Sequence, residues 1–596
     1  MLLGADMFFT TLTSGLIRRK EATLVNTAFG WVVGGNLASP SHTTLLTRNT
    51  KCTGLIKDND TCLENQLTKF FELEPNDDLR LTKDTDCELC EQHFALTHHR
   101  KPDGQFTVQI PIKSNPPPLG DTFFTAQRQL NQLWRRLSKN EDMKKLYCDF
   151  MSEYEALGHM EKIEGFDNHK FGKVISYLPH HGVLKPTSSS TKLRVVFNAS
   201  QRSMSGFTLN DTMINGGIVQ PKLTEVFVRF RAMVHVICAD IKKMYRQIAV
   251  DESQQNMQRI VWKNNEKDPI SIYRLKTVTY GTASAPYLAT RVLNQLAKDG
   301  ASEFPLASKA LLQNTYVDDI MSGADSVAEA LEMQRQLIEL LDGAAMTLHK
   351  WCSNTSQILE LVPECAREPL ISLNEKFDAV VKTLGMLWDS KMDVFTYKIQ
   401  LAQSDGSTTK RSALSQIASI FDPLGLLAPV IVTYKLFIQT LWKQKNLEWD
   451  TPISAEDEAR WQTLRKNLVT LETLTIPRCI KPDSAGLFEL HGFADASGYA
   501  YGACIYLVSK SINGIVTNSS LIVAKSKVGP QQSISIPRME LLAATMLAKL
   551  MSDTRVALNL KIMSSTCWSD STTVLVWIST PNEMLKQFCA NRVALI

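Results

Sequence analysis

The stretch NTYVDDIMSG, residues 314–323, places two aspartates side by side between apolar residues and a glycine. Adjacent carboxylates repel each other, and the strict alternation of a strand would point them to opposite faces. A tight turn frees consecutive side chains from that alternation, so we expect Asp318 and Asp319 at a hairpin. Taken alone, an Asp-Asp pair is more often a solvated turn than a site, so its interpretation depends on the rest of the chain.

A third aspartate lies upstream. The segment VHVICADIKKMYRQIAV, residues 234–250, reads as an apolar strand that ends in Asp240 and is followed by a turn. If this strand neighbours the Asp318 segment in one sheet, three carboxylates converge. Two Mg²⁺ ions, hard cations that prefer carboxylate oxygens, would neutralise them. Such a pair of ions can activate a primer 3′-hydroxyl and stabilise leaving pyrophosphate, as in polymerases.

Length and composition set wide limits. The chain has 596 residues, which suggests roughly four domains at about 150 residues each. Its 44% hydrophobic content is enough for buried cores, and a net charge of +4 does not by itself indicate a nucleic-acid binder. Twelve cysteines are too sparse for a disulfide scaffold. No apolar run reaches the roughly 18 residues that span a bilayer, so we expect no membrane association.

The remaining pattern alternates helices and strands. Residues 125–160 show helical periodicity, and between about 171 and 350 short β-rich runs alternate with helical ones, which indicates an α/β region. Residues from about 400 to 475 read as mostly helical. From about 485, paired strands precede two helical stretches that are separated by a short strand.

Further segments fit nucleotide binding. TKLRVVFNASQRS, residues 191–203, offers Lys192 and Arg194 to a triphosphate. TVTYGTASAPYLATR, residues 277–291, sets small residues before a helix, where the backbone can approach a base pair closely. The segments LHKWCSN and VKTLGMLWD follow in order at 348–354 and 381–389.

These ordered segments resemble the reverse transcriptase of retroelements, in particular the Bel/Pao family of long-terminal-repeat retrotransposons. The resemblance extends over essentially the whole chain. It implies a multidomain α/β and α+β fold, in which a right-hand polymerase of fingers, palm and thumb precedes an incomplete ribonuclease H-like α/β domain. The segments that carry it most closely are YLPHHGVLKPTSSSTKLRVVFNAS, CADIKKMYRQIAV, TVTYGTASAPYLATRVL and YVDDIMSGA.

The resemblance also implies roles for single residues. Asp240, Asp318 and Asp319 match the catalytic, metal-binding aspartates of the palm. Tyr245 matches the aromatic gate that disfavours a ribose 2′-hydroxyl, although a packed strand aromatic is the alternative. The other positions that match nucleotide-binding residues are Arg194, Lys192, Tyr280, Gly281 and Lys350, of which Lys350 matches a proposed proton donor or else merely covers Trp351.

A second set of carboxylates follows near the C-terminus. Asp495 and Asp570 each come at a strand end, and Glu540 lies at the start of a helix. Three carboxylates at element ends form a plausible two-metal phosphodiesterase site, although each alone is more often a cap or a surface charge. In this order they resemble the ribonuclease H domain. Because no residue is available for that family's fourth carboxylate, we expect weak or no ribonuclease H activity.

The resemblance divides the chain into five parts. Residues 1–40, which end in the strand-and-turn pattern TAFGWVVGGNL, resemble the C-terminal remnant of a retroviral-type aspartic protease. The parts that follow are a linker region (41–120), fingers and palm (121–345), a thumb or connection that is mostly helical after 400 (346–480), and the truncated ribonuclease H-like domain (485–596). No Asp-Thr-Gly or Asp-Ser-Gly loop occurs in the sequence, so we expect no proteolysis.

The segment CELCEQHFALTHH, residues 87–99, leaves two interpretations open. Cys87 and Cys90 are closely spaced, but the histidines follow too soon for a usual zinc finger, which needs a second well-spaced pair. A zinc site and a reduced, partly buried cysteine pair both fit, and the second fits better.

The leading functional hypothesis is an RNA-directed DNA polymerase that uses two Mg²⁺ ions, for which Mn²⁺ can substitute. Its partners would be an RNA template, a DNA primer, their hybrid and deoxynucleoside triphosphates; the oligomeric state is left open. The resemblance to this family implies that the polymerase is located in cytoplasmic virus-like particles, with a nuclear phase. The alternatives are a decayed element that binds nucleic acid without polymerising, and a Pao-type aspartic peptidase, which the missing catalytic loop disfavours.

Overall fold

The computed structural model describes the backbone of residues 12–18, 23–27 and 30–34, and the full residues in 85–163, 174–184, 192–371, 379–399, 407–444, 446–481, 486–532 and 534–596. The chain divides into two units, Met1–Asn65 and Gln66–Ile596. The first unit holds an antiparallel sheet of β1 (Leu12–Arg18), β2 (Thr23–Thr27) and β3 (Gly30–Gly34), in that order. The strand expected near TAFGWVVGGNL is therefore present, whereas the protease relationship stays a prediction.

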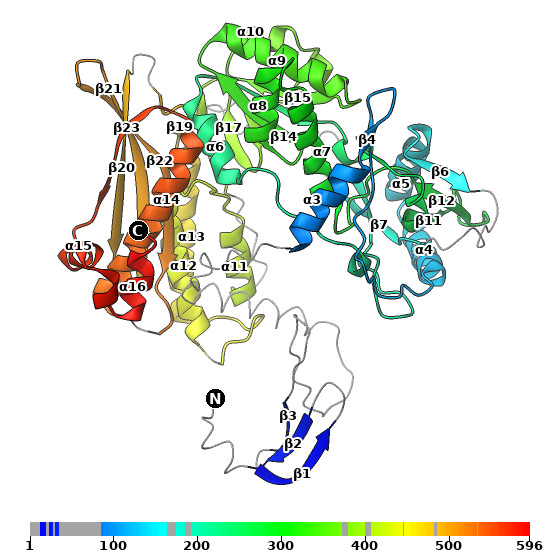
Figure 1. Cartoon of the computed structure of the whole chain (residues 1–596), viewed down its shortest axis with the longest axis horizontal. Coiled ribbons are helices and arrows are strands. Elements are labelled where there is room, and N and C mark those ends of the chain that lie inside the picture. Colours follow the sequence, from blue (N-terminus) through cyan, green and yellow to red (C-terminus); the bar gives the residue numbers. More distant parts are fainter. Residues whose placement is uncertain are drawn as a thin grey trace. The chain divides into compact units, whose positions relative to one another are not determined.

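The central sheet of the second unit, which we call the palm sheet, is antiparallel and has the order β13-β14-β9-β15. The apolar run of β9 lies inside the sheet, and Val236, Ile237, Cys238 and Ala239 are all buried. Helices α6, α8 and α9 pack against β14 (Figure 1). The bounds are β13 (Thr315–Tyr316), β14 (Asp319–Ala324), β9 (His235–Ile241), β15 (Leu348–Ser353), α6 (Leu223–Ala232), α7 (Ala285–Asp299), α8 (Pro305–Gln313) and α9 (Val327–Asp342).

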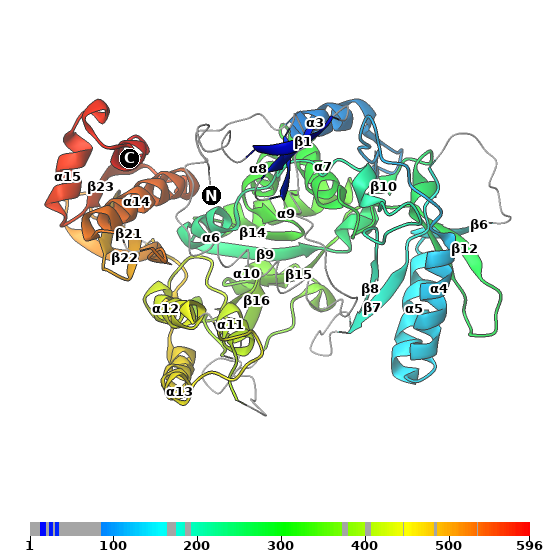
Figure 2. The same cartoon turned by 90° about the horizontal axis from the view of Figure 1, so that it is seen from below.

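The helical periodicity of residues 125–160 is confirmed as two helices, α4 (Phe123–Leu137) and α5 (Glu141–Ala156). The side chain of Asn140 caps α5 by accepting a hydrogen bond from the Met143 amide at 3.0 Å. These helices pack beside a β7–β8 hairpin and a β11-β12-β6 sheet (Figure 2). The bounds of these strands are β6 (Met160–Ile163), β7 (His180–Leu184), β8 (Leu193–Phe197), β11 (Arg259–Trp262) and β12 (Ser271–Leu275).

The expected linker region 41–120 is wrong in its second half; residues 41–84 lie outside the described residues. Residues 85–112 form α3 (Thr85–Thr97), β4 (His99–Arg100) and β5 (Phe106–Val108), and β5 pairs with β10 (Ala249–Val250). Glu91 of α3 accepts a hydrogen bond from Tyr287 at 2.8 Å and pairs with Arg291 at 2.9 Å, both on α7. A few well-buried side chains, such as Phe94 and Phe106, hold this polar stretch in the core.

After the palm sheet come a small sheet and a helical region. The sheet has the order β16-β17-β18-β19. Its first hairpin turns at Leu384 and Gly385, both with positive φ (46° and 95°), which is the pattern of a type I′ turn. The helices expected after residue 400 are present as α11, α12 and α13. The bounds are β16 (Val380–Thr383), β17 (Met386–Asp389), β18 (Val394–Thr396), β19 (Ile476–Pro477), α11 (Lys410–Ala418), α12 (Ala428–Lys443) and α13 (Ala455–Val469).

The C-terminal sheet has the order β22-β21-β20-β23, with β23 parallel to β20. Helix α14 lies close against β20, since a Cβ added at Gly492 would meet Leu547 Cδ1 at 2.5 Å. The paired strands and two helices expected here are confirmed, as is the α/β and α+β fold class. The bounds are β20 (Leu487–Ala496), β21 (Ala500–Lys510), β22 (Val516–Val528), β23 (Ile562–Trp568), α14 (Ile536–Leu558), α15 (Thr572–Ser579) and α16 (Gln587–Val593).

Two buried arginines join the palm region to the C-terminal sheet. Arg231 of α6 donates to the carbonyls of Leu521 and Ile522 on β22, at 2.7 and 2.8 Å, and to the carbonyl of Arg478 at 3.1 Å. Arg478 in turn forms an ion pair with Asp393 at 2.5 Å. Because the guanidinium planes present several donors, they satisfy carbonyls of three segments at once.

Replacing Arg478 with methionine should lower the free energy of unfolding by about 3 kcal/mol, because the partly buried carboxylate of Asp393 loses its counter-charge. The Arg478 side chain is 0% exposed. The shift of the denaturant midpoint measures the loss. Lys144→Met, which removes an exposed pair with Glu141, is the control and should cost no more than about 0.5 kcal/mol. Equal effects of the two variants would contradict the prediction.

Among the helices that the structure describes, none is long and apolar enough to cross a membrane.

Candidate active site

The Asp318–Asp319 pair lies at the tip of the β13–β14 hairpin. Tyr316 is paired with Asp319, so Val317 and Asp318 form a two-residue turn. Val317 has φ 57°, whereas the φ of Asp318 is not positive. This combination is the pattern of a type II′ turn. The Asp318 carbonyl accepts a hydrogen bond from the Ile241 amide at 2.8 Å. The turn therefore breaks strand alternation at the two aspartates, as their sequence predicts.

The palm sheet brings the third aspartate beside them. Asp240 on β9 is the register partner of Asp319 on β14, and on its other side it is the partner of His349 on β15. The predicted neighbourhood of the two strands is thus confirmed. Three carboxylates of one sheet end lie together, and none of them is fully exposed.

The pKa values of the hairpin aspartates reflect this crowding. Burial, followed by the charges of Asp318 and Asp240, raises the pKa of Asp319 to about 7. Burial and the charge of Asp240 also raise the pKa of Asp318. Carboxylates that resist ionisation in this way are stabilised by a cation, so the residues present fit a divalent metal site.

Asp240 is held by two basic side chains of the protein itself. Its carboxylate accepts from Lys350 Nζ at 2.7 Å and from His349 Nε2 at 3.0 Å. A bulge in β15 between His349 and Cys352, where Lys350 has φ 55°, turns the lysine toward Asp240. Burial acts to lower the pKa of Lys350, but its hydrogen bond to Asp240 raises that pKa above the ordinary value.

The predicted nucleotide-binding residues border the same end of the palm sheet. Tyr245, in a short 3₁₀ turn (Met244–Gln247), has its ring centroid 6.4 Å from that of Tyr280. Burial and the nearby charge of Asp318 raise the pKa of Tyr245. Arg194 is exposed on β8, and its charge is among those that lower the pKa of Asp318. Lys192 is exposed at the start of the same hairpin.

Gly281 occupies a position that excludes other residues. Its φ is 104°, and an added Cβ would lie 2.1 Å from the Phe197 carbonyl oxygen of β8. Asn210 fixes the glycine from outside, since its side chain donates to the Gly281 carbonyl at 3.1 Å and accepts from the Ala283 amide at 2.8 Å. Tyr280 is thereby presented next to Tyr245 on a defined backbone.

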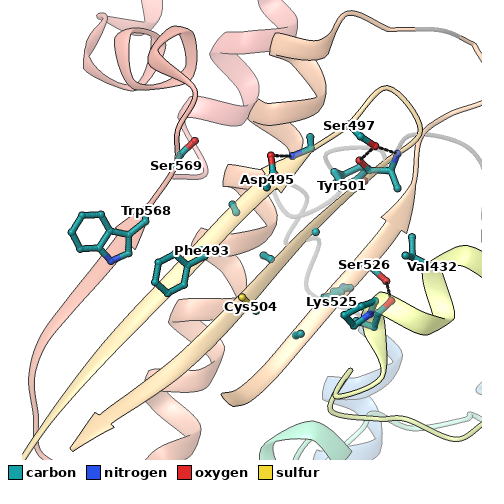
Figure 3. Close-up of a pocket in the computed structure, with 18 of the residues that line it drawn as sticks. Val432, Phe493, Asp495, Ser497, Tyr501, Cys504, Lys525, Ser526, Trp568 and Ser569 are labelled. Atoms are coloured by element: carbon teal, nitrogen blue, oxygen red, sulfur yellow. Dashed lines mark hydrogen bonds between the residues drawn. The ribbon is translucent and has the colours of Figure 1, made fainter. Parts of the chain in front are cut away.

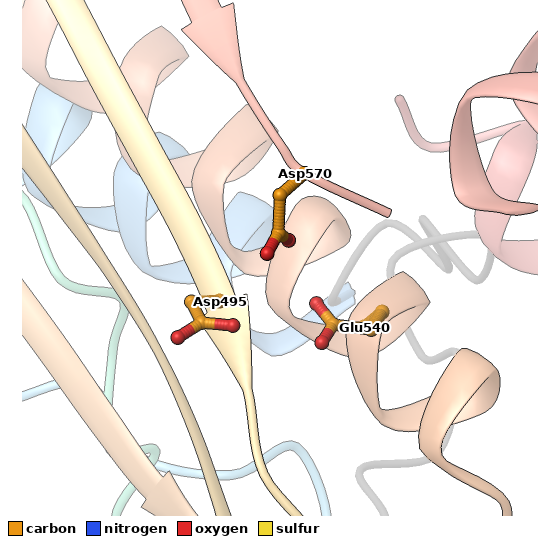
Figure 4. Close-up of side chains that lie close together, drawn as sticks. All are labelled: Asp495, Glu540 and Asp570. Carbon is orange, nitrogen blue, oxygen red and sulfur yellow. The ribbon is translucent and has the colours of Figure 1, made fainter. Parts of the chain in front are cut away.

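The second predicted set of carboxylates is assembled at the C-terminal sheet. Oxygens of Asp495, Glu540 and Asp570 all lie within 4.8 Å of one another (Figure 4). Burial, then Asp495 and Asp570, raises the pKa of Glu540, and its buried Oε2 has no hydrogen-bond partner among the described residues. An orphaned carboxylate oxygen within a tight acidic cluster fits a divalent ion.

No other group of three His, Cys, Asp or Glu side chains in the described part of the chain is as closely gathered. The palm aspartates are not gathered in this way, and Asp240 is paired with Lys350 and His349. Cys87, Cys90 and His93 do not form such a group either. Cys90 is buried and Cys87 half-buried, and neither forms a disulfide, so the choice between a zinc site and a reduced cysteine pair stays a prediction.

A cavity of about 710 Å³ opens beside the second cluster. It extends over β20, β21 and β22 to the first turn of α12, and Asp495 and Asp570 belong to its lining (Figure 3). Phe493 and Trp568 line it as well, with their rings stacked at 6.4 Å. The cluster is therefore accessible from a partly aromatic hollow.

Two known protein families match the parts of the chain that contain these two sites. Residues 185–356 match the family "Reverse transcriptase (RNA-dependent DNA polymerase)", and residues 409–571 match the "Pao retrotransposon-like RNaseH-like domain". The first range contains all three palm aspartates, and the second contains Asp495, Glu540 and Asp570. The chain therefore contains a reverse transcriptase domain followed by a Pao retrotransposon-like RNaseH-like domain.

Two foamy viral complexes are among the solved structures to which this chain is similar. The foamy viral protease-reverse transcriptase in complex with an RNA/DNA hybrid is 13% identical, with TM-score 0.49, over 96% of this chain and 67% of that chain. The dRH form of the same foamy viral protein in complex with double-stranded DNA is also 13% identical, with TM-score 0.47, over 99% of this chain and 92% of that chain. No curated protein matches the chain significantly.

The match to the RNaseH-like family begins in the helical region. It starts at Thr409, immediately before α11, and so includes the helices expected as thumb or connection together with the C-terminal sheet. The predicted reverse transcriptase activity is confirmed by the first match, and reverse transcriptases work with divalent metal ions.

Three residues of this reverse transcriptase site were not expected from the sequence: His349, Asn210 and Gln220. Each acts through strand register or through a contact between distant segments. The Gln220 side chain, for example, accepts a hydrogen bond from the Val317 amide at 2.9 Å, 97 residues away. The only sequence signal was the position of His349 next to Lys350.

Proposed function

We propose that this reverse transcriptase extends a DNA primer along an RNA template with Mg²⁺ held by Asp240, Asp318 and Asp319. The observation that carries the proposal is the register of the palm sheet, which sets Asp240 opposite Asp319 and next to the Asp318 turn. When bound, the ions activate the primer 3′-hydroxyl and neutralise the leaving pyrophosphate. Primer extension on an RNA template tests the proposal, because wild type must synthesise more DNA than the Asp318→Asn variant.

The residues around the aspartates would bind the incoming deoxynucleoside triphosphate. Arg194 is placed to pair with phosphate oxygens, for which a guanidinium is well suited, and Lys192 adds positive charge at the hairpin. Gly281 permits a close approach of backbone to the nascent base pair. Lys350, whose pKa is raised by its bond to Asp240, remains charged and would give its proton to pyrophosphate.

Tyr245 is proposed as the gate against ribonucleotides. Its ring is held edge-on by Tyr280, and Asp318 lies near enough to raise its pKa, so we expect a ribose 2′-hydroxyl to meet the ring. Tyr245→Ala should reduce the preference for deoxynucleotides over ribonucleotides about 100-fold, which is the range that one steric contact supplies. The ratio of kcat/KM values for the two nucleotides measures it. Tyr245→Phe keeps the ring and should change the ratio less than about threefold; equal effects would refute the gate.

We propose nucleic-acid hybrid as the main partner, gripped through its phosphates. The affinity should therefore fall steeply with added salt, since each neutralised phosphate releases counterions. Titration of a labelled RNA–DNA hybrid at several salt concentrations gives the slope. The alternative of a decayed element predicts the same slope without any synthesis.

Asp495, Glu540 and Asp570 are proposed to hold divalent ions of a ribonuclease H-like site, as their close grouping supports. A peptidase function has no support among these residues, because the second family match is to an RNaseH-like domain and no protease loop occurs in the sequence. The peptidase hypothesis would gain support if the chain cleaved itself and the replacement of one aspartate abolished the cleavage.

A further inference from the structure

The turn that carries the aspartate pair has an unfavourable backbone. Val317 is β-branched and has φ 57°, a region that glycine occupies readily and that valine avoids. The first position of a type II′ turn is usually glycine for this reason. Something outside the turn must hold Val317 in this conformation, because a β-branched residue would relax from it.

Helix α6 and the residues before it supply two anchors for the hairpin. At the base, Arg229 Nε donates to Asn314 Oδ1 at 2.9 Å, and Asn314 donates to Ser322 Oγ across the hairpin at 3.0 Å. At the tip, the Val317 amide donates to Gln220 Oε1 at 2.9 Å. The tip anchor therefore acts on the one residue of the turn that has positive φ.

The position of Gln220 is fixed by the proline that follows it and by the buried helix α6. Pro221 follows it and restricts its backbone, and α6 begins two residues later at Leu223. Val226, Phe227 and Phe230 of this helix are fully buried, so the segment that carries Gln220 is fixed to the core. Gln220 and Pro221 also line a small cavity of about 20 Å³ together with Val317, which leaves the turn little room to shift.

We infer that Gln220 is a positioning residue for catalysis, which clamps the Val317 amide and so aims Asp318 and Asp319 at the position opposite Asp240. The inference rests on the proposed roles of these aspartates in DNA synthesis. Gln220 acts through the turn, and its loss would let Val317 relax toward negative φ and rotate both carboxylates.

Four variants separate positioning from general stability. Gln220→Leu removes the acceptor at similar size, and Gln220→Glu keeps an acceptor oxygen. Val317→Gly removes the strain, because glycine adopts φ 57° without help. The fourth is the double variant Gln220→Leu/Val317→Gly. Gln132→Leu, an exposed glutamine of α4, is the matched control and should behave as wild type.

Gln220→Leu should lower kcat for primer extension about thirtyfold and change the deoxynucleotide KM less than about threefold, since a small misplacement of reacting groups costs up to about 100-fold. Gln220→Glu should restore kcat to within about fivefold of wild type. In the Val317→Gly background, the loss on replacing Gln220 should shrink to less than about fivefold. Wild-type kcat in Gln220→Leu, or an equal loss in both backgrounds, overturns the inference.

A readout without metal or substrate tests the clamp independently. Wild type, Gln220→Leu, Val317→Gly and the double variant are unfolded thermally in chelator. Gln220→Leu should lower the midpoint in the Val317 background and clearly less in the Val317→Gly background. Equal shifts would overturn the clamp even if activity fell. If wild type synthesises no DNA, the proposed function fails, but this unfolding cycle still decides on the clamp.

Discussion

Replacing Asp318 with asparagine should lower the rate of DNA synthesis on an RNA template at least about a thousandfold. The carboxylate lies at a hairpin tip beside Asp240 and Asp319, and its pKa is raised by burial and by Asp240. An amide provides no negative charge for a divalent ion, and such an ion contributes several kcal/mol to the transition state. Each 1.36 kcal/mol is a factor of about ten in rate. Single-turnover primer extension measures the change.

Asp325→Asn serves as the matched control for this experiment. Asp325 directly follows β14, but its side chain is 66% exposed and pairs with Lys481 rather than with the palm aspartates. We expect this variant to retain the wild-type rate within about twofold, since an exposed pair contributes little. If Asp318→Asn kept more than a tenth of the wild-type rate, Asp318 would not be a metal ligand.

Replacing Asp319 with asparagine should make the metal-free protein more stable at pH 8, by up to about 4 kcal/mol. Burial and two neighbouring carboxylates raise the folded-state pKa of Asp319 to about 7, above its ordinary value of 3.8. A carboxyl with a raised folded-state pKa binds its proton more tightly in the folded state. Wild type therefore loses stability as the pH rises from about 4 through 7, and the asparagine variant avoids this loss.

Unfolding midpoints in chelator at pH 4.5 and pH 8 test whether the variant is more stable than wild type at the higher pH. The difference between Asp319→Asn and wild type should be small at pH 4.5 and large at pH 8. Adding Mg²⁺ at pH 8 should stabilise wild type more than the variant, because the variant lacks one palm carboxylate, whereas the cluster of Asp495, Glu540 and Asp570 is the same in both proteins. Asp149→Asn, an exposed change on α5, should follow wild type throughout. A variant less stable than wild type at pH 8 without metal would contradict the prediction.

Local patterns predicted much of this architecture. Helices α4, α5 and α14 follow apolar periodicity. Strand β9 is an apolar run with Asp240 as its penultimate residue, and β14 is an apolar run that begins with Asp319. The convergence of Asp240 with Asp319 needed only the assumption that these two strands are neighbours. The three carboxylates near the C-terminus were likewise expected from their positions at element ends, and the structure gathers them within 4.8 Å.

Contacts between distant segments were not predictable in this way. The bond of Gln220 to Val317 depends on how α6 packs under a hairpin 97 residues later. His349 reaches Asp240 because of a bulge in β15, which no periodicity indicates. Residues 85–112 were expected as a linker, since their few apolar side chains show no period. Tertiary burial of Phe94 and Phe106 overrides that local signal.

The most direct measurement is the identity of the nucleotide that the purified chain adds to a labelled DNA primer on RNA templates that differ in one base, with Mg²⁺ present. The account predicts addition of the complementary deoxynucleotide opposite each of the four template bases, with none by Asp318→Asn. Binding of the hybrid without addition, or addition that ignores the template base, would contradict the assignment of this chain as an active RNA-directed DNA polymerase.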